Sequence, residues 1–253
     1  MTANEKTTET TAPCQQPLCS GGAVAWFEKH GQSNFLDVCY AAAPARIQAA
    51  LAAELEFVRA GLRGTGRVLE IGCGDGRLLE SLRDLGCEWV GVDLMESYLR
   101  FARSSRQVAA GTGFAAGRAG QLPFADASFD AVLCAQNTLG LLGDEKLPTL
   151  REAVRVTRPG GTLLFVVYSE FSIVPRVEWY TQMLQQGMMA PIDWASSGPE
   201  LLLTDDGHAS ECFRRARLEA LFAEAGLTPR LERVGEIYWA ATAVKSPISN
   251  LKS

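Results

Sequence analysis

The chain has 253 residues, of which 47% are hydrophobic and 21% are charged, and its formal net charge is −5. This composition is typical of a globular protein with a substantial core, and the acidic balance disfavours a nucleic-acid partner, since such proteins usually carry a basic face. The seven cysteines include no C-x-x-C pair and only two histidines are present, so the common zinc spacings are absent and no metal is expected.

No apolar run is long enough to cross a bilayer, and residues 1–20 lack the apolar stretch of a signal peptide. We therefore expect a cytoplasmic protein with reduced thiols and without a membrane partner. Residues 1–20 are polar and rich in threonine, which is typical of a disordered tail. The sequence leaves the oligomeric state open.

The spacing of apolar residues predicts helices and strands that alternate along the chain. In chain order we expect a helical segment over 21–62, a strand at 67–71, a helix that stops at Gly86, a strand at 89–93, a helix at 97–110, strands at 113–117 and 129–135, a helix over 147–154, a strand at 162–168, a helix at 213–225, and strands at 228–234 and 236–244.

This alternation predicts an α/β fold, in which right-handed crossovers give a parallel sheet with helices on both faces. The last two strands have a short connection and should form an antiparallel hairpin. Residues 169–212, rich in Met, Trp, Pro and Ser, interrupt the alternation and are expected to be an insertion. Such a segment suits an apolar lid over a cleft, or it packs only against itself. Residues 213–245 would complete the sheet.

A glycine-rich turn follows the first strand in the sequence VLEIGCGDG at 68–76. Ligands of parallel sheets bind beyond the carboxyl ends of the strands, so this turn should contact a ligand. The dinucleotide fingerprint G-x-G-x-x-G needs a third glycine where this chain has Arg77. Glu70 beside the turn would repel a pyrophosphate, whereas it favours a ligand with an ammonium and a sulfonium group. A bracing role in the loop is the alternative for Glu70.

The second strand ends at Asp93, and a carboxylate there can accept hydrogen bonds from both ribose hydroxyls. The alternative role for Asp93 is the N-cap of the following helix. Both carboxylates together indicate a positively charged nucleoside more than a dinucleotide. A nicotinamide oxidoreductase remains possible only if Glu70 points away from the ligand.

Four blocks, VLEIGCGDGRLL, VGVD, LPFADASFDAVLCAQ and LREAVRVTRPGGTLLFV, resemble in order and spacing the class I S-adenosylmethionine-dependent methyltransferases. The resemblance implies a Rossmann-like, seven-stranded, mostly parallel sheet whose last strand is antiparallel, with residues 63–168 as the S-adenosylmethionine-binding core. It also implies cofactor-binding roles for Glu70, Gly72, Cys73, Gly74 and Gly76 at the methionine end, Asp93 at the ribose, Leu94 on the adenine, Ala119, Gly120, Gln121 and Leu122 at the adenine edge, and Ala135, Gln136 and Asn137 near the sulfonium.

One position departs from the pattern of this family. Relatives often have an acidic residue for the adenine amino group where this chain has Arg118. The adenine would then be contacted by the backbone or by Gln121, or the register of the loop is shifted.

The resemblance implies methyl transfer to a small-molecule acceptor by in-line attack on the sulfonium. Transfer to RNA or protein, another reaction in the same pocket, and a non-catalytic cofactor-binding module are the alternatives. A hydroxyl or ammonium acceptor needs a base, whereas a thiol acceptor can do without one. Tyr40, Glu170 and His208 are weak candidates for that base, and the sequence does not choose among them.

Overall fold

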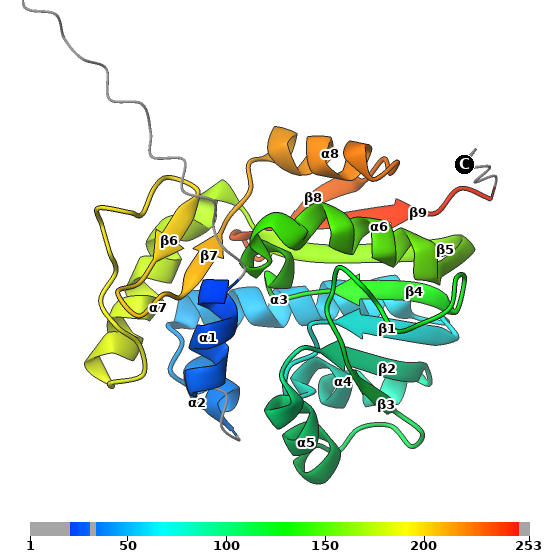
Figure 1. Ribbon diagram of the computed structural model, residues 1–253, viewed down its shortest axis with the longest axis horizontal. Helices are drawn as coiled ribbons and strands as arrows, with labels where there is room; N and C mark the ends of the chain where they lie inside the picture. Colours follow the sequence, from blue (N-terminus) through cyan, green and yellow to red (C-terminus); the bar gives the residue numbers. More distant parts are fainter. Residues whose placement is uncertain (1–20, 31–33, 248–253) are drawn as a thin grey trace, which may run out of the picture.

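The computed structural model describes residues 21–30 and 34–247, so the tail expected over residues 1–20 lies outside the described part of the chain. The helices and strands alternate as Figure 1 shows. In chain order they are α1 (Gly21–His30), α2 (Phe35–Ala41), α3 (Ala45–Leu62), β1 (Arg67–Ile71), α4 (Arg77–Ser81), β2 (Glu88–Asp93), α5 (Glu96–Ser105), β3 (Gly113–Ala116), β4 (Phe129–Cys134), the 3-10 helix η2 (Thr138–Leu141), α6 (Lys146–Val156), β5 (Thr157–Tyr168), α7 (Ile173–Gln185), β6 (Leu201–Leu203), β7 (Ala209–Glu211), α8 (Arg215–Glu224), β8 (Arg230–Val234) and β9 (Tyr238–Val244).

Seven strands form one sheet in the order β3-β2-β1-β4-β5-β9-β8. The first five of these strands pair in parallel, and β9 runs antiparallel to both β5 and β8. The expected α/β fold with a mostly parallel sheet and an antiparallel last strand is therefore confirmed. Successive strands are added on one side of β1 up to β3 and on its other side from β4 onwards, and parallel sheets bind ligands at the carboxyl ends of the strands at such a switch point.

Alternate residues of the central strands enter two separate cores, one on each face of the sheet. Val68 packs in the core under α3 and α4, whereas Leu69 and Ile71 pack in the core under α6 and α8. Glu70 shares the face of Val68 by this alternation. It is therefore buried at the strand end next to α3 and α4, rather than exposed at the rim.

Several predicted elements differ from the structure in length. The helix expected to stop at Gly86 ends as α4 at Ser81 and is followed by a 3-10 helix at Arg83–Leu85. The helix expected at 97–110 ends at Ser105, and β5 begins at Thr157 rather than at residue 162. Thr157 pairs with Phe129, and an irregularity in the register between Phe129 and Ala131 lets the strand continue through Arg158–Gly161. The preceding helix α6 ends at Val156, and Gly160 and Gly161 lie inside an irregular strand, which a one-dimensional pattern does not reveal.

The segment 169–212 contains α7 and a separate two-stranded sheet, β6–β7. These elements lie beside α1 and α2 at the left of Figure 1, beyond the carboxyl ends of the central strands. Trp179 of α7 donates its Nε1–H to the carbonyl oxygen of Cys39 at 3.0 Å, and Trp26 donates its Nε1–H to Asp206 at 2.9 Å. The segment thus packs against the N-terminal helices, and not only against itself.

Candidate functional site

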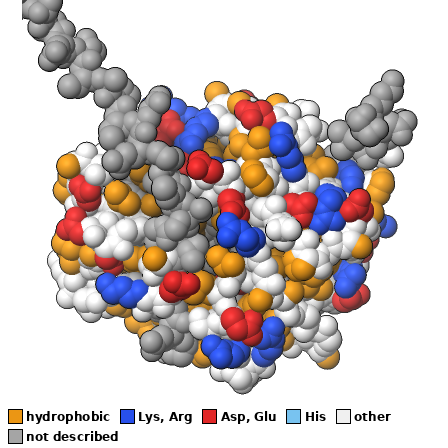
Figure 2. Space-filling model, in the orientation of Figure 1, with side chains coloured by type: hydrophobic (Ala, Val, Ile, Leu, Met, Phe, Trp, Pro, Cys, Tyr) orange, Lys and Arg blue, Asp and Glu red, His pale blue; other side chains and the backbone are white. Residues whose placement is uncertain are grey.

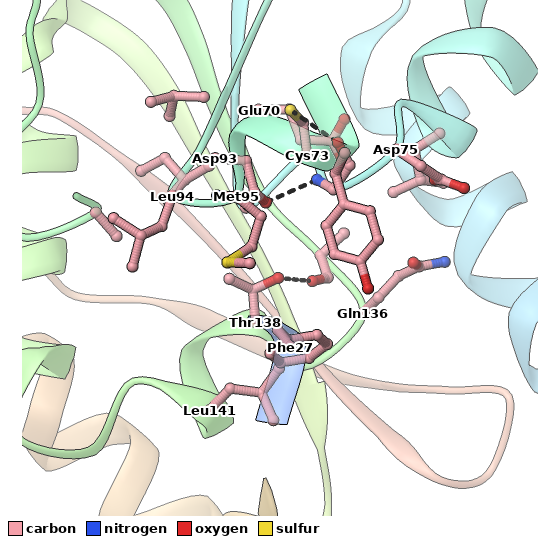
Figure 3. A pocket seen from close by; sticks show the side chains of 18 of the residues that line it. Phe27, Glu70, Cys73, Asp75, Asp93, Leu94, Met95, Gln136, Thr138 and Leu141 are labelled. Carbon is pink, nitrogen blue, oxygen red and sulfur yellow. Dashed lines mark hydrogen bonds between the residues drawn. The ribbon is translucent and has the colours of Figure 1, made fainter. Parts of the chain in front are cut away.

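A cavity of about 190 Å³ lies at the carboxyl ends of β1, β2 and β4. Figure 3 shows side chains from the glycine turn, the β2 end, the turn after β4 and α1 surrounding one space. The lining residues are Phe27, Leu36, Tyr40, Glu70, Ile71, Gly72, Cys73, Gly74, Asp75, Arg77, Leu78, Val92, Asp93, Leu94, Met95, Tyr98, Gly117, Arg118, Ala119, Ala135, Gln136, Thr138, Leu141, Leu142 and Glu145.

The glycine turn needs glycine for two separate reasons. Gly72, Gly74 and Gly76 all have positive φ, at 72°, 51° and 81°, where other residues are strained. A Cβ atom on Gly72 would also collide with the side chain of Thr138 in η2. The N–H groups of Gly72 and Cys73 donate to the carbonyl oxygen of Val92 at 2.8 and 3.1 Å, which ties the turn to β2.

Asp93 is not the N-cap of α5, which is Met95, but its carboxyl group accepts two backbone hydrogen bonds beside the cavity. Its Oδ2 accepts from the Gly74 N–H at 2.8 Å, and its Oδ1 accepts from the Met95 N–H at 2.8 Å. The carboxyl group nevertheless lines the cavity, and each oxygen retains a lone pair for a further donor. Burial raises the pKa of Asp93 above its usual value, although the backbone N–H groups oppose that rise.

Glu70 faces the cavity while only 4% of its surface is exposed. Burial raises the pKa of Glu70 to about 8; Arg77 opposes the rise, and Glu54, Asp93 and Asp75 add to it. Its Oε2 has no hydrogen-bond partner among the described residues. A buried carboxyl oxygen without a partner is costly, so the site suits a ligand that brings a hydrogen-bond donor.

Asp75, the acidic residue inside the glycine turn, is held by Arg106. The Arg106 guanidinium pairs with Asp75, with Asp37 of α2 at 2.8 Å and with Glu80 of α4 at 3.2 Å. Asp75 therefore braces the turn against α2, in addition to lining the cavity. The sequence did not suggest Arg106 or Asp37, because 69 residues separate them.

Two consecutive residues after β4 adopt left-handed backbone conformations. Gln136 has φ 53° and Asn137 has φ 60°, which is uncommon for residues other than glycine. Glu54 of α3 holds this turn, because its Oε1 accepts from the Gln136 N–H at 2.7 Å. Glu54 is fully buried, and burial raises its pKa to about 7. Sequence reasoning missed Glu54, since a glutamate in an alanine-rich helix looks like part of a solvated face.

The side chains of the same turn connect it to the surrounding segments. The Tyr40 hydroxyl of α2 donates to Oε1 of Gln136 at 2.9 Å. Asn137 donates from Nδ2 to Ser210 Oγ at 3.1 Å and accepts at Oδ1 from the Tyr168 N–H at 2.9 Å. The turn after β4 therefore joins the sheet, the N-terminal helices and the 169–212 segment.

A second cavity of about 90 Å³ adjoins the first. The two cavities share the walls formed by Phe27, Leu36, Tyr40, Gln136 and Leu141. The remaining walls of the second cavity come from α1, α2, the turn after β4, β5, α7, the segment after α7 and the 204–210 region. They are Trp26, Phe35, Cys39, Asn137, Tyr168, Trp179, Tyr180, Met183, Met189, His208 and Ser210.

The structure separates the three residues considered as a base. Tyr40 lines both cavities, but burial raises its pKa well above the usual range, so its hydroxyl stays protonated. Glu170 lines neither cavity and accepts from Trp239 Nε1–H at 2.8 Å. His208 lines the second cavity, with its Nε2 at 3.1 Å from the Tyr180 hydroxyl.

The cofactor-binding residues expected from the sequence divide into two groups. The residues that line the first cavity are Glu70, Gly72, Cys73, Gly74, Asp93, Leu94, Ala135 and Gln136. The residues that do not are Gly76, which begins α4, Gly120, Gln121 and Leu122, which lie beyond the lining part of their loop, and Asn137, which lines the second cavity.

The loop expected at the adenine edge meets the cavity earlier in the chain than residues 119–122. Gly117, Arg118 and Ala119 line the cavity, and Arg118 pairs with Glu145, another lining residue. Leu122 is instead buried in the core under α6, and its N–H donates to Glu152 at 2.7 Å. The loop therefore meets the cavity at residues 117–119 and not at 120–122.

The surface and the remaining side chains add three observations. Figure 2 shows acidic and basic side chains interspersed over the visible face, without a large area of one sign. Over residues 21–30 and 34–247, no three His, Cys, Asp or Glu side chains are grouped to hold a metal. Within those same ranges, no helix has the length and apolar character needed to cross a membrane.

Residues 69–165 match the protein family described as "Methyltransferase domain". The chain is 35% identical over 134 residues to a demethylmenaquinone methyltransferase of Renibacterium salmoninarum, which covers 53% of this chain and 54% of that protein. It is 39% identical over 135 residues to a malonyl-[acyl-carrier protein] O-methyltransferase of Erwinia pyrifoliae, which covers 53% of this chain and 48% of that protein. The chain thus spans about half the length of the curated relatives it matches.

Solved structures agree with the fold over a larger part of the chain. The 1,6-didemethyltoxoflavin-N1-methyltransferase of Burkholderia thailandensis, bound to 1,6-didemethyltoxoflavin and S-adenosylhomocysteine, has a TM-score of 0.59 at 20% identity and covers 94% of this chain and 93% of its own. A SAM-dependent methyltransferase of Methanosarcina mazei has a TM-score of 0.57 at 19% identity, over 75% of this chain and 97% of its own. At such identities the likeness supports the fold alone.

Proposed function

Since the chain belongs to the class I S-adenosylmethionine-dependent methyltransferases, we propose that it transfers a methyl group to a small-molecule acceptor by in-line attack. The observation that carries this proposal is the pair of adjoining cavities. The first combines a glycine turn with two buried acidic residues, and the second is enclosed by aromatic side chains. A ligand in each cavity would lie next to the other across the shared walls, which an in-line transfer requires.

The first cavity suits S-adenosylmethionine on two structural observations. The unpartnered Oε2 of Glu70 can accept from an ammonium group, and Asp93 retains lone pairs for ribose hydroxyls. We assign the methionine end to Glu70 and the glycine turn, the ribose to Asp93, and the adenine to Leu94 and the Gly117–Ala119 backbone. The bound cofactor supplies a methyl group on a sulfonium, which is already an activated leaving group.

The protein then contributes orientation and the exclusion of water. Phe27 and Leu36 cover the junction of the two cavities, and Tyr40 closes it through its hydrogen bond to Gln136. We propose residues 63–168 as the cofactor-binding core, residues 21–62 and 169–212 as the cover over the acceptor, and residues 213–245 as the completion of the sheet. The five described cysteines are all free, in keeping with a cytoplasmic location.

Two features support a small molecule over RNA or protein as the acceptor. The second cavity holds about 90 Å³ and is walled by both segments outside the core. Charges of both signs alternate over the face in Figure 2, whereas an RNA-binding face is usually basic. Demethylmenaquinone and 1,6-didemethyltoxoflavin, named for two of the similar proteins, are small molecules. Malonyl-[acyl-carrier protein] is a small group carried by a protein, so this relative favours neither a small molecule nor a protein as the acceptor.

Calorimetry with S-adenosylmethionine, S-adenosylhomocysteine and NAD tests the cofactor assignment. The protein should bind the first two, and Asp93→Ala should lose both. Glu88→Ala is the matched control, because Glu88 is an exposed carboxylate at the opposite end of the same strand. Unchanged binding by Asp93→Ala would refute the ribose assignment, and preferential binding of NAD would refute the cofactor.

A screen with labelled methyl donor tests the reaction itself. Label should pass to a metabolite and not to RNA or protein of the same extract. Binding of S-adenosylmethionine without transfer to any acceptor would instead support the non-catalytic module.

A further inference from the structure

We propose that the second cavity is the acceptor site and that its acceptor is a phenol or an equivalent enol, methylated on oxygen. The proposal rests on the proposed function, since it names the substrate class of that site. It follows from the size, the wall chemistry and the charge of this cavity. None of the residues that line the cavity lies within 69–131.

The walls of the cavity suit a flat ring. Seven aromatic side chains line it: Trp26, Phe27, Phe35, Tyr40, Tyr168, Trp179 and Tyr180. Met183 and Met189 complete the apolar wall and make favourable sulfur–aromatic contacts possible. An apolar cavity of about 150 Å³ in another protein accepts benzene. The second cavity, at about 90 Å³, is smaller than that, so one ring fits only if it extends past the shared walls towards the first cavity of about 190 Å³.

The charge around the cavity favours an acidic acceptor over a cationic one. No Asp or Glu in the described part of the chain lines the cavity. Arg176 of α7 is fully buried directly behind the wall, with its Cζ 4.5 Å from the ring centre of Tyr168 and 5.8 Å from that of Tyr180. Its Nη2 donates to the carbonyl oxygen of Ser210 at 2.7 Å, but its Nε and Nη1 have no partner among the described residues.

Among the described residues, no carboxylate forms an ion pair with this guanidinium; Glu211, next to Ser210, pairs instead with Lys146. Asp206 accepts from Trp26 Nε1–H at 2.9 Å and from the Thr204 hydroxyl at 2.5 Å, and it does not line the cavity. Glu54 lies behind Gln136 and accepts from its backbone. A buried charge without a counter-charge stabilises a negative ligand nearby, so the positive side of the cavity favours a phenolate and disfavours an ammonium.

A hydrogen-bonded pair on the wall can take up the acceptor's proton. His208 is 7% exposed, its Nε2 is 3.1 Å from the Tyr180 hydroxyl, and its ring centre is 4.5 Å from that of Trp26. With Nε2 unprotonated, the Tyr180 hydroxyl donates to it and passes on the proton of the acceptor hydroxyl. A carboxylic acid acceptor is already ionised near neutral pH and would not need this pair.

The acceptor O–H bond breaks and its proton passes through the Tyr180 hydroxyl to His208. The freed electron pair of the oxygen forms the bond to the methyl carbon, as the bond from that carbon to the sulfonium sulfur breaks. The sulfur keeps that electron pair and becomes a neutral thioether. The products are an aryl methyl ether, a thioether and a protonated His208, which loses its proton to solvent.

Three probes of similar shape test the acceptor class by calorimetry and absorbance with S-adenosylhomocysteine present: 4-nitrophenol, 4-nitroaniline and 4-nitrobenzoate. We expect 4-nitrophenol to bind at least tenfold more tightly than the other two. Its absorption should shift to that of the phenolate at a pH where the free compound is still protonated. Equal or tighter binding of the aniline or the benzoate, or binding without the phenolate absorption, would overturn the proposal.

Two variants test whether 4-nitrophenol binds in the second cavity. Met183 lines only that cavity, so Met183→Trp should fill it and lose 4-nitrophenol while S-adenosylhomocysteine binds as in the wild type. Met189→Phe is the smaller second variant if Met183→Trp does not fold. Retained 4-nitrophenol binding in a folded variant would refute the site. Failure of the wild type to bind S-adenosylhomocysteine would refute the proposed function instead.

The role of the Tyr180–His208 pair in accepting the proton is tested by His208→Gln, assayed with the phenol that the wild type methylates best. We expect kcat to fall at least tenfold with KM within threefold, and the acidic limb of the kcat–pH profile to disappear. Tyr180→Phe should reproduce the loss in kcat. An unchanged pH profile in His208→Gln would show that another group accepts the proton.

Discussion

The protein should release a proton from Glu70 when its cofactor binds, and replacing Glu70 by glutamine should abolish that release. Burial raises the pKa of Glu70 to about 8, so the carboxyl group is mostly protonated at pH 7 in the protein alone. An ammonium beside it favours the ionised form and lowers that pKa. With a pKa near 8, about 0.9 proton should be released at pH 7 and about 0.1 at pH 9, since each pH unit changes the ratio of forms tenfold.

The affinity should follow the same titration. Binding needs the carboxylate, so the affinity falls as the pH drops below about 8, by about tenfold for each pH unit. It should level off above that pH. Calorimetry of S-adenosylhomocysteine binding, in buffers with different heats of ionisation at one pH, measures the proton release directly. Glu70→Gln should abolish both the release and the pH dependence.

Two further variants identify the proton's source. Glu88→Gln, at the exposed far end of β2, should leave the release unchanged. Glu54 also has a raised pKa, of about 7. Together with Arg77, Asp75 and Asp93, it is one of the charged groups that act on Glu70. A release that persists in Glu70→Gln and disappears in Glu54→Gln would refute the reasoning about Glu70. A wild type that releases no proton at pH 7 would refute it as well.

Three other predictions concern the turn, an ion pair and stability. Gly72→Ala should weaken S-adenosylhomocysteine binding more than tenfold, because its Cβ collides with a neighbouring side chain. Gly64→Ala, with φ 76° but open space around it, should cost only about 1–2 kcal/mol of stability in urea titrations and leave binding intact. Arg106→Gln should lower the free energy of unfolding by about 3–5 kcal/mol, since it strands a buried carboxylate. Changing its half-exposed partner Asp37 to Asn should lower the free energy of unfolding by under about 1 kcal/mol. Equal losses in Arg106→Gln and Asp37→Asn would contradict this reasoning. The raised pKa of Glu54 gives stability that is complete below the unfolded pKa of about 4.5 and is lost as the pH rises through about 7, a loss of about 3 kcal/mol that Glu54→Gln should remove from a pH series of unfolding curves. A wild type whose stability does not fall over that range would contradict it.

The sequence predicts the sheet well, because its strands are short apolar runs and its turns carry glycine. Glu70, the glycine turn and Asp93 follow from the same local pattern, since each lies at a strand end. The charge of Glu70 does not follow, because the sequence reveals neither its burial nor the missing hydrogen-bond partner. The expectation of a carboxylate that repels phosphate therefore applies only at a pH above the raised pKa of this group.

Contacts between distant segments account for what the sequence did not reveal. Glu54 and Gln136 are 82 residues apart, and Tyr40 lies 96 residues from Gln136. No local pattern announces such contacts. The second cavity depends on them entirely, since its walls combine α1, α2 and α7 with the ends of the central strands. Arg176 also escaped prediction, because an arginine in an amphipathic helix is ordinarily exposed.

The walls of the second cavity come largely from outside residues 69–165, the stretch that matches the family described as "Methyltransferase domain". Chains with nearly identical cores can therefore prefer unrelated acceptors, and resemblance in that stretch is a poor guide to the identity of the methyl acceptor. Grafting residues 21–62 and 169–212 onto a relative's core should carry acceptor choice with them. New specificities in this architecture can then arise by exchanging the flanks, without disturbing the machinery that holds the methyl donor.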